Sequence, residues 1–155
     1  MSESPCLVVD MPADDGLRRR AAAWVVEEWP HLFPDDTEEW YLDVWADADT
    51  SGTDAPHAVV ALLDGEVVGT ASMVLDDELP GAPEPGPWIA AVWVHPDHRR
   101  KGAGRAMVRE LMSRAGGRLW LYTENEADWY VAMGWAPVRD ATLNGHTVTV
   151  MTWCS

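Results

Sequence analysis

Residues 92–105 of this 155-residue chain read VWVHPDHRRKGAGR. An apolar strand pattern runs here into a turn with three consecutive basic residues and two glycines, and an apolar-periodic helix pattern follows. Gly102 and Gly104 let the backbone approach a ligand, and a helix start presents unpaired amide groups and the positive end of its dipole. The stretch therefore predicts a cradle for an anion such as a phosphate group.

Positive charge is concentrated around this turn, although the chain as a whole is acidic. Residues 95–118 contain seven basic and two acidic side chains, whereas the whole chain has a net charge of −15. A surface that negative repels nucleic acid and anionic lipid, so we expect neither a nucleic-acid partner nor a membrane partner. The basic segment is predicted to bind an anion despite these surroundings, and a solvated basic turn is the alternative.

Length and composition indicate one globular domain over residues 1–155, with a substantial apolar core. No apolar run approaches the about 20 residues of a membrane span, and the first residues, MSESP, lack the features of a signal or transit peptide. A cytoplasmic location is therefore expected. Cys6 and Cys154 are too few for a disulfide framework or a zinc site, so we expect no metal. The two thiols could be neighbours if both chain ends lie in one sheet.

The periodicity of apolar residues and the positions of capping and turn-forming residues predict the order of helices and strands. An acidic segment over residues 14–56 is expected to hold a helix at 14–29, a second helix started by Asp35, Asp36 or Thr37, and a polar linker at 49–56. Asp-Gly and Asn-Gly pairs at 64–65 and 144–145 are typical of tight hairpin turns. The remaining elements are expected as strands at 6–9, 58–63, 66–75, 88–94, 118–123 and 146–153, a loop at 76–87, and helices at 104–115 and 127–133.

Two well-known phosphate-binding loops do not match the basic turn. A Walker loop requires Gly-Lys followed by Ser or Thr, and a Rossmann fingerprint requires a third glycine where Met107 stands. What remains is Arg99, two residues, Gly102, one residue and Gly104, between a buried strand and a helix.

This arrangement resembles the signature of the GNAT superfamily of acyl-CoA-dependent N-acetyltransferases. In that family the turn follows a strand ending Val-x-Pro, here Val94-His95-Pro96. A second family element is similar to WYVAMGW at 129–135, and PWIA at 87–90 is similar to a subgroup of small GNAT enzymes. The resemblance covers residues 58–153, and the segment 14–56 stands where the family places its substrate-recognition helices.

The resemblance implies an α/β (α+β) GNAT fold, with a mixed, mainly antiparallel twisted sheet of about 6–7 strands and about four helices. The parallel strands at 88–94 and 118–123 would splay apart and admit acetyl-CoA as co-substrate. The pantetheine arm would pair with the backbone of two strand residues, and the pyrophosphate would lie on the amides of the turn. The implied coenzyme-binding residues are Val92, Val94, Arg99, Arg100, Lys101, Gly102, Ala103, Gly104 and Arg105.

Two groups are expected to act on the acetyl transfer itself. Tyr130 is the proposed donor of a proton to the departing thiolate, because the ordinary pKa of a tyrosine, near 10, is close to that of a thiol, about 8.5. The backbone amide of Val92 is the expected donor to the oxygen that gains negative charge. Simple packing of Tyr130 on its short helix is the alternative.

The general base is harder to assign. Many relatives carry a glutamate on the strand before the turn, but residues 88–94 contain no carboxylate. Glu124 is preferred because it follows a strand end beside the expected cleft. Glu28, Asp76 and His57 remain alternatives, and so does an amine that arrives already neutral.

Four of the ten tryptophans lie on the two acidic helices, where they could receive a cationic amine by cation–π attraction. Packing of these rings against the sheet is the alternative. The four are Trp24, Trp29, Trp40 and Trp45, and the expected acceptor-binding residues are Glu28, Trp29 and Trp40.

The resemblance and these residues predict transfer of an acetyl group from acetyl-CoA to a primary amine, by direct attack in a ternary complex. The acceptor would be a small molecule or a peptide, and a cationic acceptor is favoured by the acidic helices. A covalent acyl-enzyme is not expected, because neither cysteine falls near the motif. The competing hypotheses are a non-catalytic acyl-CoA-binding regulator on the same fold and a nucleotide-binding module, and both a monomer and a homodimer are compatible with the sequence.

Overall fold

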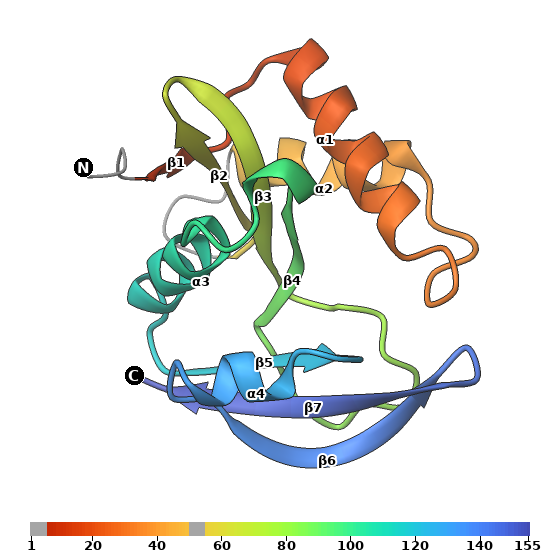
Figure 1. The fold of residues 1–155 in the computed structure, drawn as a ribbon. Coiled ribbons are helices and arrows are strands. Elements are labelled where there is room, and N and C mark those ends of the chain that lie inside the picture. Colours follow the sequence, from red (N-terminus) through yellow and green to blue (C-terminus); the bar gives the residue numbers. More distant parts are fainter. Residues whose placement is uncertain (1–5, 50–54) are drawn as a thin grey trace.

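The computed structural model describes residues 6–49 and 55–155, and within these ranges the chain forms one seven-stranded sheet with four α-helices (Figure 1). The strand order is β1-β2-β3-β4-β5-β7-β6. The elements are β1 (Leu7–Asp10), α1 (Asp15–Glu28), α2 (Glu38–Ala48), β2 (His57–Leu63), β3 (Glu66–Val74), β4 (Trp88–Val94), α3 (Ala103–Ser113), β5 (Arg118–Thr123), α4 (Ala127–Val131), β6 (Ala136–Leu143) and β7 (His146–Cys154), with a 3-10 turn at Pro96–His98.

Local sequence explains where the first two helices begin. The side chain of Asp14 accepts a hydrogen bond from the amide of Leu17 at 2.9 Å and caps α1. Thr37 does the same for α2, where it accepts from the amide of Trp40 at 3.3 Å. Each cap satisfies an amide that has no partner inside the helix. Of the three expected starting residues for the second helix, Thr37 is therefore the cap.

Both predicted hairpin turns are present. Asp64 and Gly65 have φ values of 51° and 83°, and Asn144 and Gly145 have values of 47° and 81°. Positive φ at both central residues is the geometry of a tight turn that matches the twist of the flanking strands. The turns set the antiparallel pairs β2–β3 and β6–β7.

The sheet is covered on both faces by helices (Figure 1). In β2, Val59 and Ala61 pack with α3, whereas Ala58 and Val60 pack with α1 and α2. This alternation is the period of two expected for a strand that is buried on both faces. Trp45 of α2 is fully buried there.

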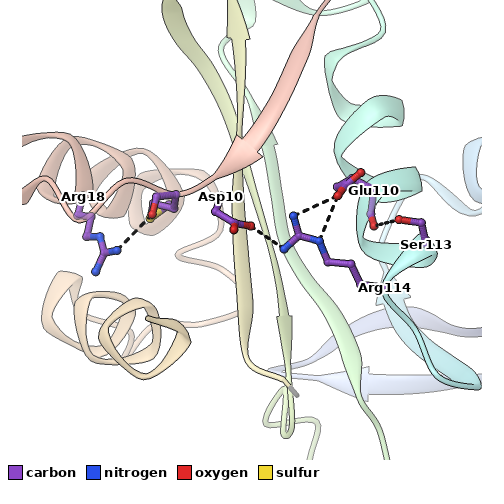
Figure 2. Close-up of polar contacts among 6 residues, drawn as sticks. Asp10, Arg18, Glu110, Ser113 and Arg114 are labelled. Carbon is purple, nitrogen blue, oxygen red and sulfur yellow. Dashed lines mark hydrogen bonds and ion pairs between the residues drawn. The ribbon is translucent and has the colours of Figure 1, made fainter. Parts of the chain in front are cut away.

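Ion pairs hold the edge strand β1 between helices of the two faces. Figure 2 shows Arg114, after the end of α3, between Asp10 of β1 at 2.7 Å and Glu110 of α3 at 3.1 Å. On the other side of β1, the guanidinium of Arg18 donates to the carbonyl of Met11 at 3.3 Å. These contacts fix the outer edge of the sheet, away from its centre.

The parallel strands β4 and β5 separate almost at once, as expected. Their only aligned pair within the described residues is Trp88 with Trp120, where the amide of Trp120 also donates to the carbonyl of Pro87 at 3.1 Å. Beyond this point the two strands diverge (Figure 1). The opening lies at the centre of the sheet, between β4 and β5.

The predicted loop before β4 joins the two halves of the sheet. Glu84 forms a paired contact with Arg139 of β6, with oxygen–nitrogen distances of 2.7 and 3.1 Å. The hydroxyl of Tyr122 in β5 donates to the carbonyl of Asp77 at 2.8 Å. The loop thus closes one side of the opening.

Several boundaries differ slightly from the expected ones. Helix α3 begins at Ala103 and ends at Ser113, and α4 ends at Val131 because Gly134, at φ 102°, turns the chain and donates its amide to Val131. The expected linker at 49–56 lies largely outside the described residues. Cys6 precedes the edge strand β1 and Cys154 ends β7, so strands β2 to β5 separate the two thiols. Among the described helices, none has the length and apolar character needed to cross a membrane.

We expect Glu84→Gln to lower the free energy of unfolding by up to about 1 kcal/mol at pH 7, because it removes one charge of a part-buried pair. Arg139 lowers the pKa of Glu84, so the pair stabilises the fold above the ordinary glutamate pKa, and this stabilisation is lost as pH falls through the lowered value. Urea unfolding at pH 7 and pH 3 tests this. The exposed Glu66 provides the matched control, Glu66→Gln. An equal deficit for Glu84→Gln at both pH values would contradict the assignment.

Candidate active site

The diverging strands β4 and β5 open onto a cleft of about 630 Å³. Its lining comes from both sides of the sheet: from the basic turn and the start of α3, from α4, and from α1, α2 and the segment that connects them. The cleft therefore lies at the centre of the fold, with walls from both sides of the sheet.

The basic turn forms one wall of the cleft. Arg100 and Gly102 have φ values of 65° and 88°, and Gly102 leads directly into α3. An added Cβ on Gly102 would meet no atom within 4 Å, so glycine is favoured here by the backbone angle and not by lack of space. The first amides of this 11-residue helix have no partner inside the helix and lie at the positive end of its dipole. Such a helix start is suited to bind an anion.

Arg99 does not extend freely toward the cleft. Its Nε donates to the carbonyl of Val94 at 2.9 Å, and its terminal nitrogen pairs with Glu28 at 3.1 Å. The side chain therefore joins the turn to β4 and to the end of α1. Glu28, a candidate base and acceptor-binding residue, lines the cleft but already has this cationic partner.

Gly104 lies against Trp129, the first residue of the WYVAMGW motif at 129–135. A Cβ on Gly104 would come within 3.4 Å of the Trp129 ring and 3.5 Å of Val94. The absent side chain lets β4, α3 and α4 approach one another at the cleft wall. Trp129 and Gly104 both line the cleft.

A β-bulge redirects the backbone of β4 inside the cleft. Thr70 of β3 pairs with Trp93 and Ser72 pairs with Ala90, so two residues of β4 stand opposite one residue of β3. Ala91 in the bulge has φ 54°, a conformation that non-glycine residues rarely adopt. Bulges interrupt the regular ladder and re-aim neighbouring groups. Val92, the second residue of this bulge, lines the cleft.

Tyr130 is positioned by aromatic neighbours on α4 and after it. Its ring packs edge-on against Trp129, with centroids 4.9 Å apart, and against Trp135 at 6.0 Å. The side chain lines the cleft and is only 7% exposed. Burial raises the pKa of Tyr130, and the charge of Glu126 raises it further. The hydroxyl therefore keeps its proton throughout the physiological pH range.

Glu124 lines the cleft just beyond the end of β5. Its Oε1 lies 2.8 Å from Nε2 of His31, and its Oε2 lies 3.3 Å from Nδ1 of His146. The sequence did not suggest these two histidines, because they lie far from Glu124 along the chain.

The other predicted site residues divide into two groups. Lys101, Arg105 and Asp76 are absent from the cleft lining, and His57 lines a separate cavity of about 530 Å³ near Arg18. The remaining predicted residues all line the cleft, namely Glu28, Trp29, Trp40, Val92, Val94, Arg99, Arg100, Gly102, Ala103, Gly104, Glu124 and Tyr130.

A model of the Acetyltransferase (GNAT) family matches residues 17–135. The chain belongs to this family. The matched region includes most of α1, the basic turn and Tyr130, so it contains residues from every wall of the cleft described above.

Similarity to individual GNAT proteins is more distant. The mycothiol acetyltransferase of Mycolicibacterium vanbaalenii is 29% identical over an alignment of 131 positions that covers 73% of this chain and 42% of that protein, so the chain spans about two fifths of its length. Among solved structures, an aminoglycoside 6'-N-acetyltransferase complexed with coenzyme A superposes with a TM-score of 0.72 at 14% identity over 96% of each chain. An acetyltransferase from Thermus thermophilus superposes with a TM-score of 0.69 at 19% identity over the full length of both. At these identities the structural likeness shows the fold alone.

The GNAT cleft of this chain has an acidic and aromatic end that sequence patterns did not reveal. Asp36, Asp77 and Glu78 line it, and burial raises the pKa of each carboxyl, most strongly that of Asp77. The hydroxyl of Tyr41 donates to Asp36 at 2.7 Å, and Tyr122 lies on the same wall. The only available signal was the acidic run at 76–78 that follows a strand, in a segment predicted simply as a loop.

The tryptophans of the two acidic helices serve different purposes in this GNAT fold. Trp24 stacks on Trp93 at 4.6 Å and Trp45 is fully buried, so both belong to the core. Trp29 and Trp40 line the cleft, so both stay candidates for binding the acceptor.

We expect Gly102→Ala to destabilise the protein by about 1–2 kcal/mol, because an L-residue must then adopt the left-handed conformation. Chemical denaturation measures the loss. Gly116 is the matched control, since its added Cβ also meets no atom within 4 Å and its backbone is not in the left-handed region. Gly116→Ala should be neutral or slightly stabilising. Equal stability of the two variants would contradict the argument that the backbone angle at position 102 requires glycine.

Proposed function

We propose that this chain transfers the acetyl group of acetyl-CoA to a primary amine by direct attack in a ternary complex, and that the amine belongs to a cationic molecule. The observation that carries the proposal is the opening between β4 and β5 directly beside the glycine turn at the start of α3. The opening can admit an extended arm, and the turn faces an anion.

The described residues fit the coenzyme. Amides from Arg100 to Arg105 are proposed to hold the pyrophosphate, and β4 from Val92 to Val94 is proposed to pair with the pantetheine arm as an added strand would. Because the carbonyl of Val94 already accepts from Arg99, pairing at that residue would use its other lone pair or its amide. When bound, acetyl-CoA supplies the activated acetyl group as a thioester.

Two groups of the chain are proposed to assist the transfer. The amide of Val92, set by the bulge in β4, donates to the acetyl oxygen as that oxygen gains charge, which is worth about 2.7–4 kcal/mol for a fixed donor. Tyr130 protonates the departing sulfur. Burial disfavours the phenolate form of Tyr130 and so raises its pKa. The same environment disfavours a free thiolate, so the pKa of the departing coenzyme thiol would rise as well and the proton transfer would stay feasible.

Glu124 is the proposed general base for the acceptor ammonium. It lines the cleft, and its described side-chain partners are two imidazoles. Glu28, the other carboxylate considered, is held by Arg99. No carboxylate of β4 competes for this role, because β4 contains none.

The acceptor is proposed to carry a second positive charge at the acidic end of the cleft. Within the described residues, Asp36, Asp77 and Glu78 form no ion pair with a basic side chain. A bound ammonium would therefore meet three carboxyl groups without a competing cation, and its charge would favour their ionised forms. Trp40 and Tyr41 supply aromatic faces beside them. The relatives named for aminoglycoside and mycothiol acetylation support an amine acceptor in general terms.

The direct experiment is to measure free CoA released from acetyl-CoA across a panel of diamines, polyamines, aminoglycosides, basic peptides, neutral amines and amino acids. We expect turnover with di- or polycationic amines above neutral ones. Tight binding of acetyl-CoA without turnover on any amine would favour the non-catalytic acyl-CoA-binding regulator. Stabilisation by ATP but not by acetyl-CoA would favour a nucleotide-binding module and overturn the proposal.

We expect Tyr130→Phe to lower kcat by about 10²-fold, the lower end of general acid–base contributions, while the Kd for acetyl-CoA changes less than about twofold. Steady-state kinetics with calorimetric binding separates the two quantities. Full retention of kcat, with chemistry shown to limit the rate, would remove Tyr130 from the mechanism.

Glu78→Gln should raise KM for a diamine by about tenfold, equivalent to about 1.4 kcal/mol, and have little effect on a monoamine of the same length. The physical reason is the loss of one charge at the acidic end of the cleft, because Glu78 is exposed and its pKa is raised less than that of Asp77. Asp43→Asn, an exposed change on α2 outside the cleft lining, is the matched control. A parallel rise for both amines would argue against a second ammonium site.

A further inference from the structure

Three side chains from distant parts of the sequence meet at the edge of the cleft. Glu124 follows β5, His31 lies between α1 and α2, and His146 begins β7. The two imidazoles take different oxygens of the one carboxylate, at 2.8 and 3.3 Å, and their ring centroids are 5.0 Å apart. One carboxylate is thus held from two sides.

His31 also fixes the segment at residues 29–37, which we call the acceptor loop. Its carbonyl accepts a hydrogen bond from the side chain of Asn144 in the β6–β7 turn at 2.7 Å. Phe33 of the same loop lies 6.4 Å from the ring of Tyr122 in β5. The acceptor loop supplies Trp29 and Asp36 to the cleft, so these contacts place a wall of the acceptor site against the C-terminal half of the sheet.

The carboxylate faces the cleft, and the imidazoles lie behind it. Glu124 lines the cleft and its side chain is 24% exposed, whereas His31 and His146 are absent from the cleft lining and are 39% and 43% exposed. A carboxylate has about four lone-pair sites, so one contact to each oxygen leaves sites for an acceptor amine.

We propose that His31 and His146 are positioning residues for Glu124, and that His31 at the same time fixes the acceptor loop. This inference rests on the proposed function. The acceptor ammonium loses one proton to a carboxylate oxygen of Glu124, and its freed lone pair attacks the acetyl carbon. As the C–N bond forms, the C–S bond of the thioester breaks and the sulfur takes the proton of Tyr130. The nitrogen releases its second surplus proton, which restores the Tyr130 hydroxyl, and Glu124 returns its proton to solvent. The imidazoles do not touch the acceptor; they hold the carboxylate in the direction in which it can take that proton.

The imidazoles also give this arrangement a characteristic pH dependence. A protonated imidazole forms an ion pair with Glu124, which stabilises the carboxylate and makes it a poorer proton acceptor. The remaining ionisable groups on this end of the cleft are the carboxyls of Glu28, Asp36, Asp77, Glu78 and Glu126, the phenols of Tyr41 and Tyr122, and Arg99, which is paired to Glu28. The contribution of the two imidazoles can therefore be isolated by replacing them alone.

Amide replacements separate positioning from charge. His31→Gln places an N–H near the former Nε2, and His146→Asn places one near the former Nδ1, so the double variant keeps both donors but cannot gain a charge. The matched disruptive protein is His31→Ala with His146→Ala. Asp140→Asn, an exposed charge removal on β6 of the same hairpin, serves as the control.

At pH 8 we expect the alanine pair to lose at least about tenfold in kcat/KM, while the amide pair stays within about threefold of the unmodified protein. The ratio of kcat/KM for the amide pair to that of the unmodified protein should rise by about threefold or more as the pH falls from 8 to 5.5. The ratio cancels the ionisation of the amine and of the carboxyls other than Glu124, because these are common to both proteins. The acetyl-CoA Kd should stay within about twofold in every variant.

Hydrogen exchange gives a readout that does not need turnover. Amides of the acceptor loop should exchange faster in the alanine pair and at the normal rate in the amide pair. An alanine pair with normal kcat/KM, a ratio that stays flat with pH, or unchanged loop exchange would overturn the inference while leaving the acetyltransferase proposal intact. Loss of CoA release in the unmodified protein with every amine would instead contradict the proposed function. If the alanine pair fails to fold, the pH dependence of the amide pair alone decides.

Discussion

The fold and the cleft depend on the separation of the parallel strands β4 and β5, which pair at one position and then diverge. Buried backbone amides and carbonyls need hydrogen-bond partners, and β4 and β5 cannot supply them to each other beyond Trp88 and Trp120. The bulge at Ala91 and Val92 further interrupts the regular pairing of β4 with β3. A central sheet with such an opening is suited to receive an extended ligand that adds the missing partner groups.

Charge is distributed along the cleft in a way that suits two different ligands. The turn combines a helix start with basic side chains, whereas the acceptor side carries Asp36, Asp77 and Glu78 in a chain of net charge −15. Opposite charges at the two sides would favour the anionic coenzyme on one side and the proposed cationic amine on the other, and would disfavour each ligand on the opposite side. The pair between Arg99 and Glu28 connects the two sides.

Local patterns predicted most of the elements, because caps, Asn-Gly and Asp-Gly pairs and strand alternation act over a few residues. The turn at Gly102 and the position of Tyr130 were also accessible, since each belongs to a short contiguous motif. The residues on the acceptor side of the cleft could not be predicted in this way. Asp77 lies in a segment without periodicity, and His31 meets Glu124 across 93 positions of chain, so only the tertiary fold brings them together. No local pattern indicated that Arg99 contacts Val94 and Glu28.

The most direct measurement is a crystal structure of the protein with coenzyme A. We expect the pyrophosphate on the amides that follow Gly102 and the pantetheine arm between β4 and β5, with its sulfur end beside Val92 and Tyr130. Coenzyme bound elsewhere on the surface, or a β4–β5 opening that stays filled by the protein's own side chains at saturating coenzyme, would contradict the account.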